Sequence, residues 1–524
     1  MEIFSSLALG FSHIFQPFNL LVLFIGLVIG MAVSIMPGLG LVMGVVLALP
    51  FTYKMSIEPA IILLTAIYFS GTYGGCFTAI LYRIPGEPMD VPLLWDGYSM
   101  ARQGSPAKAL GWALIAALIG GLVSSAVMVG LATPLSAIAL KFDSPDYFAA
   151  AFFGLSTVVS LAGKSMVNSL ISLCVGLLVA TIGIDSIYGA DRFTFGIPIL
   201  RDGVQLVEVL VGMYGLGEVL TRLGQDTRIT RDTASKPNVG TQFPSIRELL
   251  QIKMTLLRST ILGTLLGIVP GAGATITSFI SYGIEKQYGR RKRLMGTGLP
   301  EGIVAPQIGS TASVAGHMIP LLTLGIPGSG ATAVILAAFL LHGVQPGPML
   351  LTDPASKVMV YTIFASMFAS VIGMCVLGFF WIRVVVKVLA IPQGILSGVV
   401  IMFCLVGAYA NRNSMSDVWM IAVFGILGYL FEKFKFPISP MVLGAILGPI
   451  GESSFMRSMI AGNNDWRVFF DAPIRGVLMG GAIAALAYPL LRALLSNFRR
   501  NGRSGSSSSK EENRTIRSVG EPLG

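Results

Sequence analysis

Two kinds of Pro-Gly motif each occur twice, at places where the surrounding sequence is strongly apolar. GMAVSIMPGLG (30–40) returns as GTLLGIVPGAG (263–273), and RIPGEP (83–88) returns as GIPGSG (325–330). A break in a membrane helix exposes backbone N–H groups at the start of the next half-helix, and these groups attract an anion. Glycine allows a carboxylate to approach the backbone closely. The paired motifs therefore predict an anion site between two related halves.

The residues expected to form this site are those of the four motifs. They are Pro37, Gly38, Leu39, Gly40, Pro85 and Gly86 in the first half, and Pro270, Gly271, Ala272, Gly273, Pro327, Gly328, Ser329 and Gly330 in the second. The alternative interpretation is that the motifs are ordinary kinks, since packed membrane helices tolerate Gly and Pro. Two motifs that are each repeated favour the functional interpretation over that alternative.

Polar residues inside or beside apolar stretches are candidates for ion coupling or charge pairing, because their burial costs free energy. The candidates are Arg83, Glu87, Asp90, Thr275, Thr277, Ser310, Thr311 and His317. Arg83 could pair with a substrate carboxylate or neutralise Glu87. His317 could couple protons or be a hydrogen-bonded structural histidine. Glu208 and Glu218 could relay protons or be solvated charges near the end of a helix.

The composition requires helices within a membrane to position these residues. Hydrophobic residues make up 54% of the chain and charged residues 12%, and the mean hydropathy is +0.77; a soluble domain has about 25% charged residues. The apolar runs are continuous and mostly about 17–25 residues long, which suits membrane helices and not alternating barrel strands. We expect an all-α polytopic membrane protein with about 10–14 hydrophobic helical elements.

The apolar stretches of the sequence fall into two length classes, complete membrane spans and shorter half-helices. Complete spans are predicted near residues 19–36, 107–132, 147–162, 166–184, 203–221, 254–269, 358–382, 393–410, 417–431 and 473–494. Half-helices or re-entrant segments, bounded by Gly and Pro, are predicted near residues 39–50, 74–84, 271–284 and 330–341. Residues 1–18 contain no Lys or Arg, so a cleavable signal peptide is not expected and the first span is retained.

A polar stretch divides the chain into two repeats. The expected divisions are a first transmembrane repeat (15–220), a linker (221–253), a second transmembrane repeat (254–495) and a disordered polar tail (496–524). Positive residues cluster at membrane edges, which explains the net charge of +10 without a nucleic-acid partner. In the loop after PGxG, the first half has only Lys54 where the second half has the basic run at 286–293. After IPG the pattern reverses, since the first half has Arg102 and Lys108 where the second half has only Lys357. This reversal favours inverted repeats, with a cytoplasmic tail.

No enzyme signature occurs in the chain. HExxH, GxSxG and GxxxxGK[ST] are absent, and the three histidines are too scattered for an ordinary metal site. We therefore expect no catalytic residues, no cofactor and no assigned metal site. Without an ATP site, uphill transport would depend on an ion gradient, with Na⁺ or H⁺ as the coupling ion.

The chain from about residue 15 to 495 closely resembles the large membrane subunit of the tripartite tricarboxylate transporters. Besides PGLG and PGAG, the resemblance rests on DGYSMARQG (96–104), GLLVATIGID (176–185), RFTFG (192–196), EGIVAP (301–306), PLLTLGIPGSGATAVIL (320–336), HGVQPGPML (342–350), GAYANRNSMSDVW (407–419) and GYLFEKFKFPISPMVLGAILGP (428–449). The resemblance implies a secondary transporter of the bacterial inner membrane that imports a di- or tricarboxylate such as citrate. It also implies a periplasmic solute-binding protein and a small four-span membrane subunit as partners.

One segment departs from the pattern of that family. After EGIVAP the family usually has an acidic residue followed by two asparagines, whereas this chain has Gln307, Ile308, Gly309, Ser310 and Thr311. The coupling ion or ligand could therefore differ from Na⁺ and citrate. The alternatives to import are a stand-alone carboxylate exporter or exchanger and, more remotely, an intramembrane enzyme. A homodimer is an expectation from transporters in general.

Overall fold

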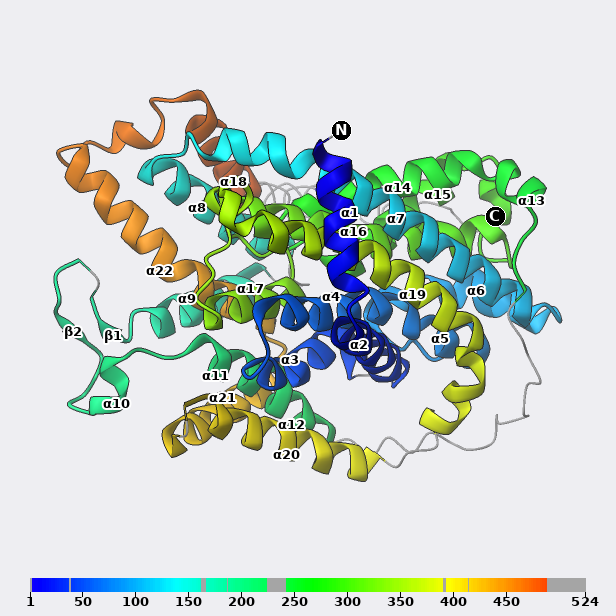
Figure 1. The fold of residues 1–524 in the computed structure, drawn as a ribbon, viewed down its shortest axis with the longest axis horizontal. Helices are drawn as coiled ribbons and strands as arrows, with labels where there is room; N and C mark the ends of the chain where they lie inside the picture. The colour runs from blue at the N-terminus through cyan, green and yellow to red at the C-terminus, as the bar shows by residue number, and fades with distance from the viewer. Residues whose placement is uncertain are drawn as a thin grey trace, which may run out of the picture.

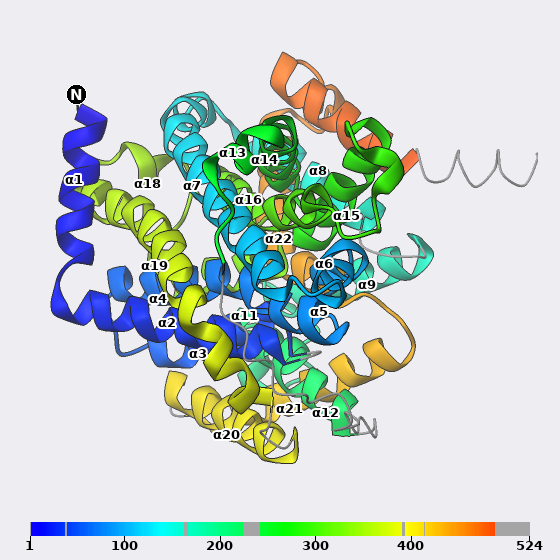
Figure 2. The same ribbon diagram turned by 90° about the vertical axis from the view of Figure 1, so that its right-hand side faces the viewer.

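The structure is a computed structural model that describes residues 2–36, 39–161, 166–185, 187–223, 242–389, 393–412 and 414–487. Helices make up almost all of the described chain (Figures 1 and 2). Its regular strands are one short antiparallel pair, β1 with β2, in which Gly183 lies opposite Arg192. This architecture confirms the predicted all-α class.

The first half begins with a helix that precedes the first predicted span. Its elements are α1 (Glu2–Ile14), α2 (Pro17–Ile35), α3 (Gly40–Thr52), α4 (Ile57–Gly74), α5 (Cys76–Tyr82), η1 (Pro88–Asp90), α6 (Leu93–Arg102), α7 (Pro106–Ala139), α8 (Ser144–Leu161), α9 (Met166–Ala180), β1 (Gly183–Ile184), β2 (Asp191–Arg192), α10 (Pro198–Arg201), α11 (Leu206–Leu210), η2 (Val211–Leu216) and α12 (Gly217–Leu223).

The second half also combines long helices with short ones. Its elements are α13 (Ile246–Gln251), α14 (Lys253–Ile268), α15 (Gly273–Tyr288), η4 (Lys292–Leu294), α16 (Pro300–Leu324), α17 (Gly330–Leu341), α18 (Pro348–Thr352), η5 (Pro354–Ser356), α19 (Lys357–Leu389), α20 (Gln393–Arg412), α21 (Met415–Lys433), α22 (Ile438–Ala461), η6 (Trp466–Phe469) and a last apolar helix, Pro473–Ala487. The half-helix predicted at 330–341 coincides with α17.

Long apolar helices make the chain a multi-pass membrane protein. Within the described residues, five helices are long and apolar enough to cross a membrane; they are Pro17–Ile35, Ile57–Tyr82, Pro106–Ala139, Pro354–Trp381 and Met415–Lys433. Shorter apolar helices, among them α3 and α17, follow the Pro-Gly breaks. Gly and Pro bound these short helices closely, which is why their limits could be predicted from the sequence.

The two most enclosed helices, α4 and α16, were not among the predicted spans. Nearly every residue of α4 is buried, and α16 is buried from Glu301 to Thr323. Both helices face protein on nearly all sides. α16 carries many small and polar side chains and is not among the candidate spans, whereas the stretch that contains α4, Ile57–Tyr82, is apolar enough to be one, so its absence from the predicted spans was an error. The two helices form the core of the molecule.

The helix pairs of the first half recur in the second. α2 packs against α3 and α4, and α14 packs against α15 and α16. Across the halves, α7 packs against α16 while α19 packs against α4 (Figure 2). In the same way, α3 packs against α17 while α15 packs against η1. Such reciprocal exchange is what a twofold relation produces. Whether the second half is inverted stays a prediction.

The polar segment before α13 is attached to α7 where it enters the described chain. The backbone N–H of Gln242 donates to the carbonyl of Ala107 at 3.0 Å, and the Lys108 ammonium donates to the Glu248 carboxylate. This ammonium, together with the backbone N–H of Ser245, lowers the pKa of Glu248 to about 2. Most of the predicted linker and the whole predicted tail lie outside the described residues.

Candidate functional site

The first PGLG break separates α2 from α3, and a carboxylate of this chain caps the second of these helices. Pro37 and Gly38 lie outside the described residues, whereas Gly40 begins α3 with a φ of +68°. Glu87 accepts hydrogen bonds from the backbone N–H of Leu41 and, at 3.1 Å, from the Ser34 hydroxyl. Glu87 is only 8% exposed. A carboxyl group of the chain itself therefore already occupies the start of α3.

Asp90 fixes the loop that presents Glu87. Its carboxylate accepts a hydrogen bond from the backbone N–H of Glu87 at 2.9 Å, and both residues form a capping box around η1. The same carboxylate lies against Gly75, where a Cβ would come within 2.0 Å of Oδ2. Asp90 is thus a positioning residue for Glu87. The structure brings together two of the predicted acids.

The second-half break has glycines at the positions where the backbone turns most sharply. Gly271 has a φ of +84° and Gly273 a φ of +58°. A Cβ on Gly271 would also lie 2.7 Å from Cα of Val158 on α8. The N–H of Gly271 donates to the carbonyl of Gly328 at 3.0 Å, so the PGAG and IPG motifs of the second half are joined directly.

Among the residues that the structure describes, no side chain caps the start of α15. Its N-cap residue, Ala272, makes no capping hydrogen bond, and Gly273, Ala274 and Thr275 are half-buried. Nearby, the Thr277 hydroxyl donates to carbonyls of its own helix and is therefore already bonded. The first turn of α15 consequently presents backbone N–H groups, together with the positive end of the helix dipole, to a partly open space.

The second IPG loop rests on a buried tyrosine–histidine pair. Ser329 caps α17 through reciprocal hydrogen bonds with Thr332. The Tyr68 hydroxyl is hydrogen-bonded to Ser329 Oγ at 2.9 Å and to His317 Nδ1 at 2.8 Å. A Cβ on Gly328 would lie 2.7 Å from the imidazole, so only glycine fits against the ring. His317 Nε2 is buried and has no hydrogen-bond partner.

The segment that departs from the family pattern joins α16 to α4. Gln307 Nε2 donates to the carbonyl of Thr72 at 2.9 Å and to Thr311 Oγ1 at 3.2 Å. The Thr72 and Thr311 hydroxyls lie 3.3 Å apart, and Ser310 donates to the carbonyl of Gln307. Gln307 Oε1 is buried without a partner. These residues form a polar junction between the two core helices.

Arg83 lies apart from Glu87. It ends α5 in the left-handed conformation, with a φ of 57°, and its guanidinium lies over the Tyr98 ring at 5.5 Å. No ion pair joins it to Glu87 in the described chain. Of the two roles that the sequence left open, neutralisation of Glu87 is therefore not supported. Glu208, whose alternatives included a solvated end charge, is 2% exposed.

Three residues of the site carried no clear sequence signal. Ser34, Tyr68 and Thr72 lie within apolar runs, where isolated hydroxyls are common in any packed membrane helix. Their roles follow only from the contacts to Glu87, Ser329 and Thr311 described above. When the IPG motifs of the two halves are aligned, Glu87 has the same position as Ser329. This alignment would have indicated that one of the two IPG loops holds site residues.

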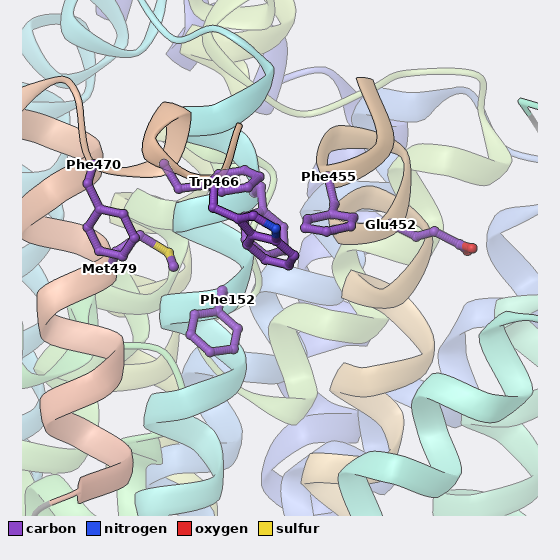
Figure 3. A pocket seen from close by; sticks show the side chains of 9 residues that line it. Phe152, Glu452, Phe455, Trp466, Phe470 and Met479 are labelled. Carbon is purple, nitrogen blue, oxygen red and sulfur yellow. The ribbon is translucent and has the colours of Figure 1, made fainter. Parts of the chain in front are cut away.

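A separate cavity of about 470 Å³ lies between α8, α22 and η6 and is aromatic. Figure 3 shows Phe152, Phe455 and Trp466 around it, with Met479 and Phe470 on one side. The one charged residue of its lining, Glu452, points away from it and pairs with Arg192. This cavity has no group that would bind a carboxylate, so it is separate from the predicted anion site.

The fold and the paired helix breaks define a class of protein, the multi-pass all-α membrane proteins with broken helices that is typical of secondary transporters. The model of the tripartite tricarboxylate transporter TctA family matches residues 20–443. The chain therefore belongs to the tripartite tricarboxylate transporter TctA family. This is a family of transporters and not of enzymes.

Two curated relatives come from Agrobacterium vitis. The chain is 35% identical over 496 residues, 95% of its length and 98% of the relative's, to an "uncharacterized 52.8 kDa protein in TAR-I ttuC' 3'region". It is 36% identical over 234 residues, 45% of its length and 96% of the relative's, to an "uncharacterized protein in TAR-II ttuC' 3'region". No solved structure shows a significant match.

Proposed function

We propose that this chain is the permease subunit that imports an organic di- or tricarboxylate, such as citrate, across the bacterial inner membrane. A Na⁺ or H⁺ gradient drives the import. The partners are a periplasmic solute-binding protein, which delivers the carboxylate, and a small four-span membrane subunit. Membership of a tripartite transporter family supports both partners in general terms.

One observation carries the proposed binding site. The two equivalent helix starts differ, because Glu87 caps α3 whereas α15 has no side-chain cap. A substrate carboxylate at the first turn of α15 would do there what Glu87 does at α3, accepting backbone N–H groups at the positive end of the dipole. The cap of α17 at Ser329 lies close by, since Gly328 is bonded to Gly271.

The coupling ion would act through the polar groups that connect the motifs. The Glu87 carboxyl group lies at the start of α3, and its hydrogen bond to the backbone of that helix is stronger when the group is ionised. His317 has one free ring nitrogen beside the second IPG loop. A proton or Na⁺ at Glu87 would weaken its hold on α3 and so link ion binding to movement of that half-helix.

The proposal is tested by uptake of labelled succinate, malate and citrate into proteoliposomes, with and without the binding protein, under imposed Na⁺ and H⁺ gradients. Gly271→Leu and Gly328→Leu should abolish uptake, because the leucine side chains would collide with Val158 and His317. Gly283→Leu is the matched control on α15, since nothing lies within 4 Å of its Cβ. Membrane insertion of all three variants is measured alongside.

Three outcomes would contradict the proposal. Absence of gradient-driven uptake for every carboxylate would remove the transport claim. Transport that does not need the binding protein and moves the carboxylate outward under the physiological gradient would instead favour a stand-alone exporter. Full activity in both Gly271→Leu and Gly328→Leu would return the motifs to ordinary kinks.

A further inference from the structure

A second cavity, of about 400 Å³, lies between α6, α15 and the loop before α16, and it contains two positive charges. Its lining consists of Arg83, Leu94, Trp95, Tyr98, Ser99, Tyr282, Lys286 and Gly296. Arg83 and Lys286 are both exposed, and no carboxylate within the described residues forms an ion pair with either. Two unpaired cations that face one cavity attract an anion, and Arg is suited to a carboxylate because it can donate two parallel hydrogen bonds.

The aromatic wall of the cavity is rigid. Trp95 packs on Tyr282 with ring centroids 4.6 Å apart and on Phe279 at 6.0 Å. Tyr282 donates to the buried carboxylate of Asp96, which also accepts the N–H groups of Gly296, Gly298 and Leu299. Asp96 is therefore fully engaged behind the wall. In the described chain Asp96 forms no ion pair with Arg83 or Lys286, so the two cations remain available.

Arg83 has a backbone conformation that is unfavourable for arginine. Counted from the IPG motifs, its equivalent in the second half is Gly325, and both residues end a helix in the left-handed region, with φ of 57° and 71°. Glycine adopts this conformation readily, whereas arginine does so at a cost. A costly arginine at a position that the other half gives to glycine indicates that the side chain has a function.

The other half has no equivalent cavity chemistry. Counted from the PGxG motifs, Lys286 corresponds to Tyr53, and counted from the IPG motifs, Tyr98 corresponds to Leu340. The positive charges are thus confined to one of the two related positions. That position is also the end of α15 that precedes the basic residues Arg290 to Arg293. The negative end of the α15 dipole, about half a charge, opposes an anion there, but two full positive charges exceed it.

We propose that this cavity is a second carboxylate site, a vestibule in which Arg83, Lys286 and Tyr98 hold the transported anion on the basic side of the protein. One helix, α15, connects it to the uncapped helix start, and Arg83 directly precedes the first IPG loop. The identity of the anion as the transported carboxylate rests on the proposed function. An anionic phospholipid headgroup would bind through the same positive charges as a carboxylate. The test must therefore separate a bound lipid from the transported carboxylate.

The test uses Trp95 as a local reporter. Succinate and citrate are titrated into the full chain in nanodiscs of zwitterionic lipid, and the fluorescence change of Trp95→Phe is subtracted because the chain has five tryptophans. Arg83→Gly should raise the half-saturating carboxylate concentration by about 10-fold or more, the loss expected for one charged hydrogen-bonding group. Because glycine is unstrained at this φ, the variant should remain folded. Arg83→Lys should recover part of the affinity.

The matched control removes one charge nearby. Lys292 is exposed in the same basic segment, bonds to the carbonyl of Gln287 and does not line the cavity, so Lys292→Gln should leave the titration unchanged. An unchanged titration in Arg83→Gly would overturn the proposal. So would a Trp95 signal that responds to phosphatidylglycerol in the nanodisc but not to carboxylates. Loss of binding in Arg83→Gly without any uptake by the wild type would contradict the proposed function while leaving the cavity site standing.

Discussion

Glu87 occupies the start of α3 in the way that a bound anion would. Two donors, the N–H of Leu41 and the hydroxyl of Ser34, hold its carboxylate, and Asp90 holds its backbone. A buried carboxylate is stable only where such donors compensate for lost hydration. Because the aligned residue of the second half is Ser329, one helix start is capped from within the protein and the other is not.

The first prediction concerns the charge of Glu87. Glu87→Gln keeps the size of the side chain and an oxygen that can accept the N–H of Leu41, so the fold should persist. Exchange of carboxylate across the membrane should continue, whereas uptake driven by the ion gradient should fall at least 10-fold because the titrating or ion-binding group is gone. Counterflow and gradient-driven uptake are measured in the same proteoliposomes. Wild-type gradient dependence in the variant would show that coupling lies elsewhere.

For individual residues, the sequence predicted the residue types of the site better than it predicted their hydrogen-bond and ion-pair partners. The positions of Glu87 and Arg83 beside the first IPG motif made both candidates. Sequence alone could not decide whether they pair, because one turn of backbone determines where each side chain points. The left-handed φ of Arg83 directs it to Tyr98, at a conformational cost of about 1–2 kcal/mol.

Among the elements, the loop before α16 depends on a single acid. Asp96 on α6 accepts three backbone N–H groups of residues 296–299 and the Tyr282 hydroxyl, and it is fully buried. A carboxylate that accepts several N–H groups stabilises a loop without any contribution from the loop's own side chains. The arrangement gives a structural role to the motif DGYSMARQG and joins α6 of the first half to α15 and α16 of the second.

The second prediction concerns this acid. Asp96→Asn places an amide N–H₂ against backbone donors, so about 2 kcal/mol of stability should be lost. Thermal unfolding of the purified protein in detergent should shift down by a few degrees. Asp465→Asn is the control, because Asp465 also accepts a backbone N–H, that of Arg467, but in an exposed turn. Equal effects of the two variants would mean that Asp96 does not pin the loop.

The limits of helices after Gly and Pro were predictable, whereas α16 and the packing partners of α4 were not. The start of α17 follows from a glycine-rich loop whose chemistry is local. The placement of α4 follows from contacts such as the one between Thr65 and Ser366, which lie 301 residues apart in sequence and 3.2 Å apart in space. A hydropathy pattern contains no information about such contacts, although the stretch that contains α4, Ile57–Tyr82, is apolar enough to be recognised as a span.

For the whole molecule, the reversal of loop charges in the sequence predicts inverted repeats, and the reciprocal packing of the halves is compatible with either orientation. The third prediction follows from equivalent loops, which should lie on opposite sides of the membrane. Lys54→Cys and Arg293→Cys are introduced singly into a background without Cys174 and Cys375. A membrane-impermeant maleimide should label position 54 in intact spheroplasts and position 293 only after permeabilisation. Labelling of both from one side would establish parallel repeats.

The exchange of α4 and α19 between the halves also has a consequence for how the protein is made. The partner of Thr65 is synthesised 301 residues later. At about 5–20 residues/s, α4 waits roughly 15–60 s in the membrane before α19 emerges from the ribosome. During that interval the surface of α4 that α19 later covers faces lipid or the insertion machinery, so the apolar residues of this helix serve its insertion as well as its packing in the finished protein.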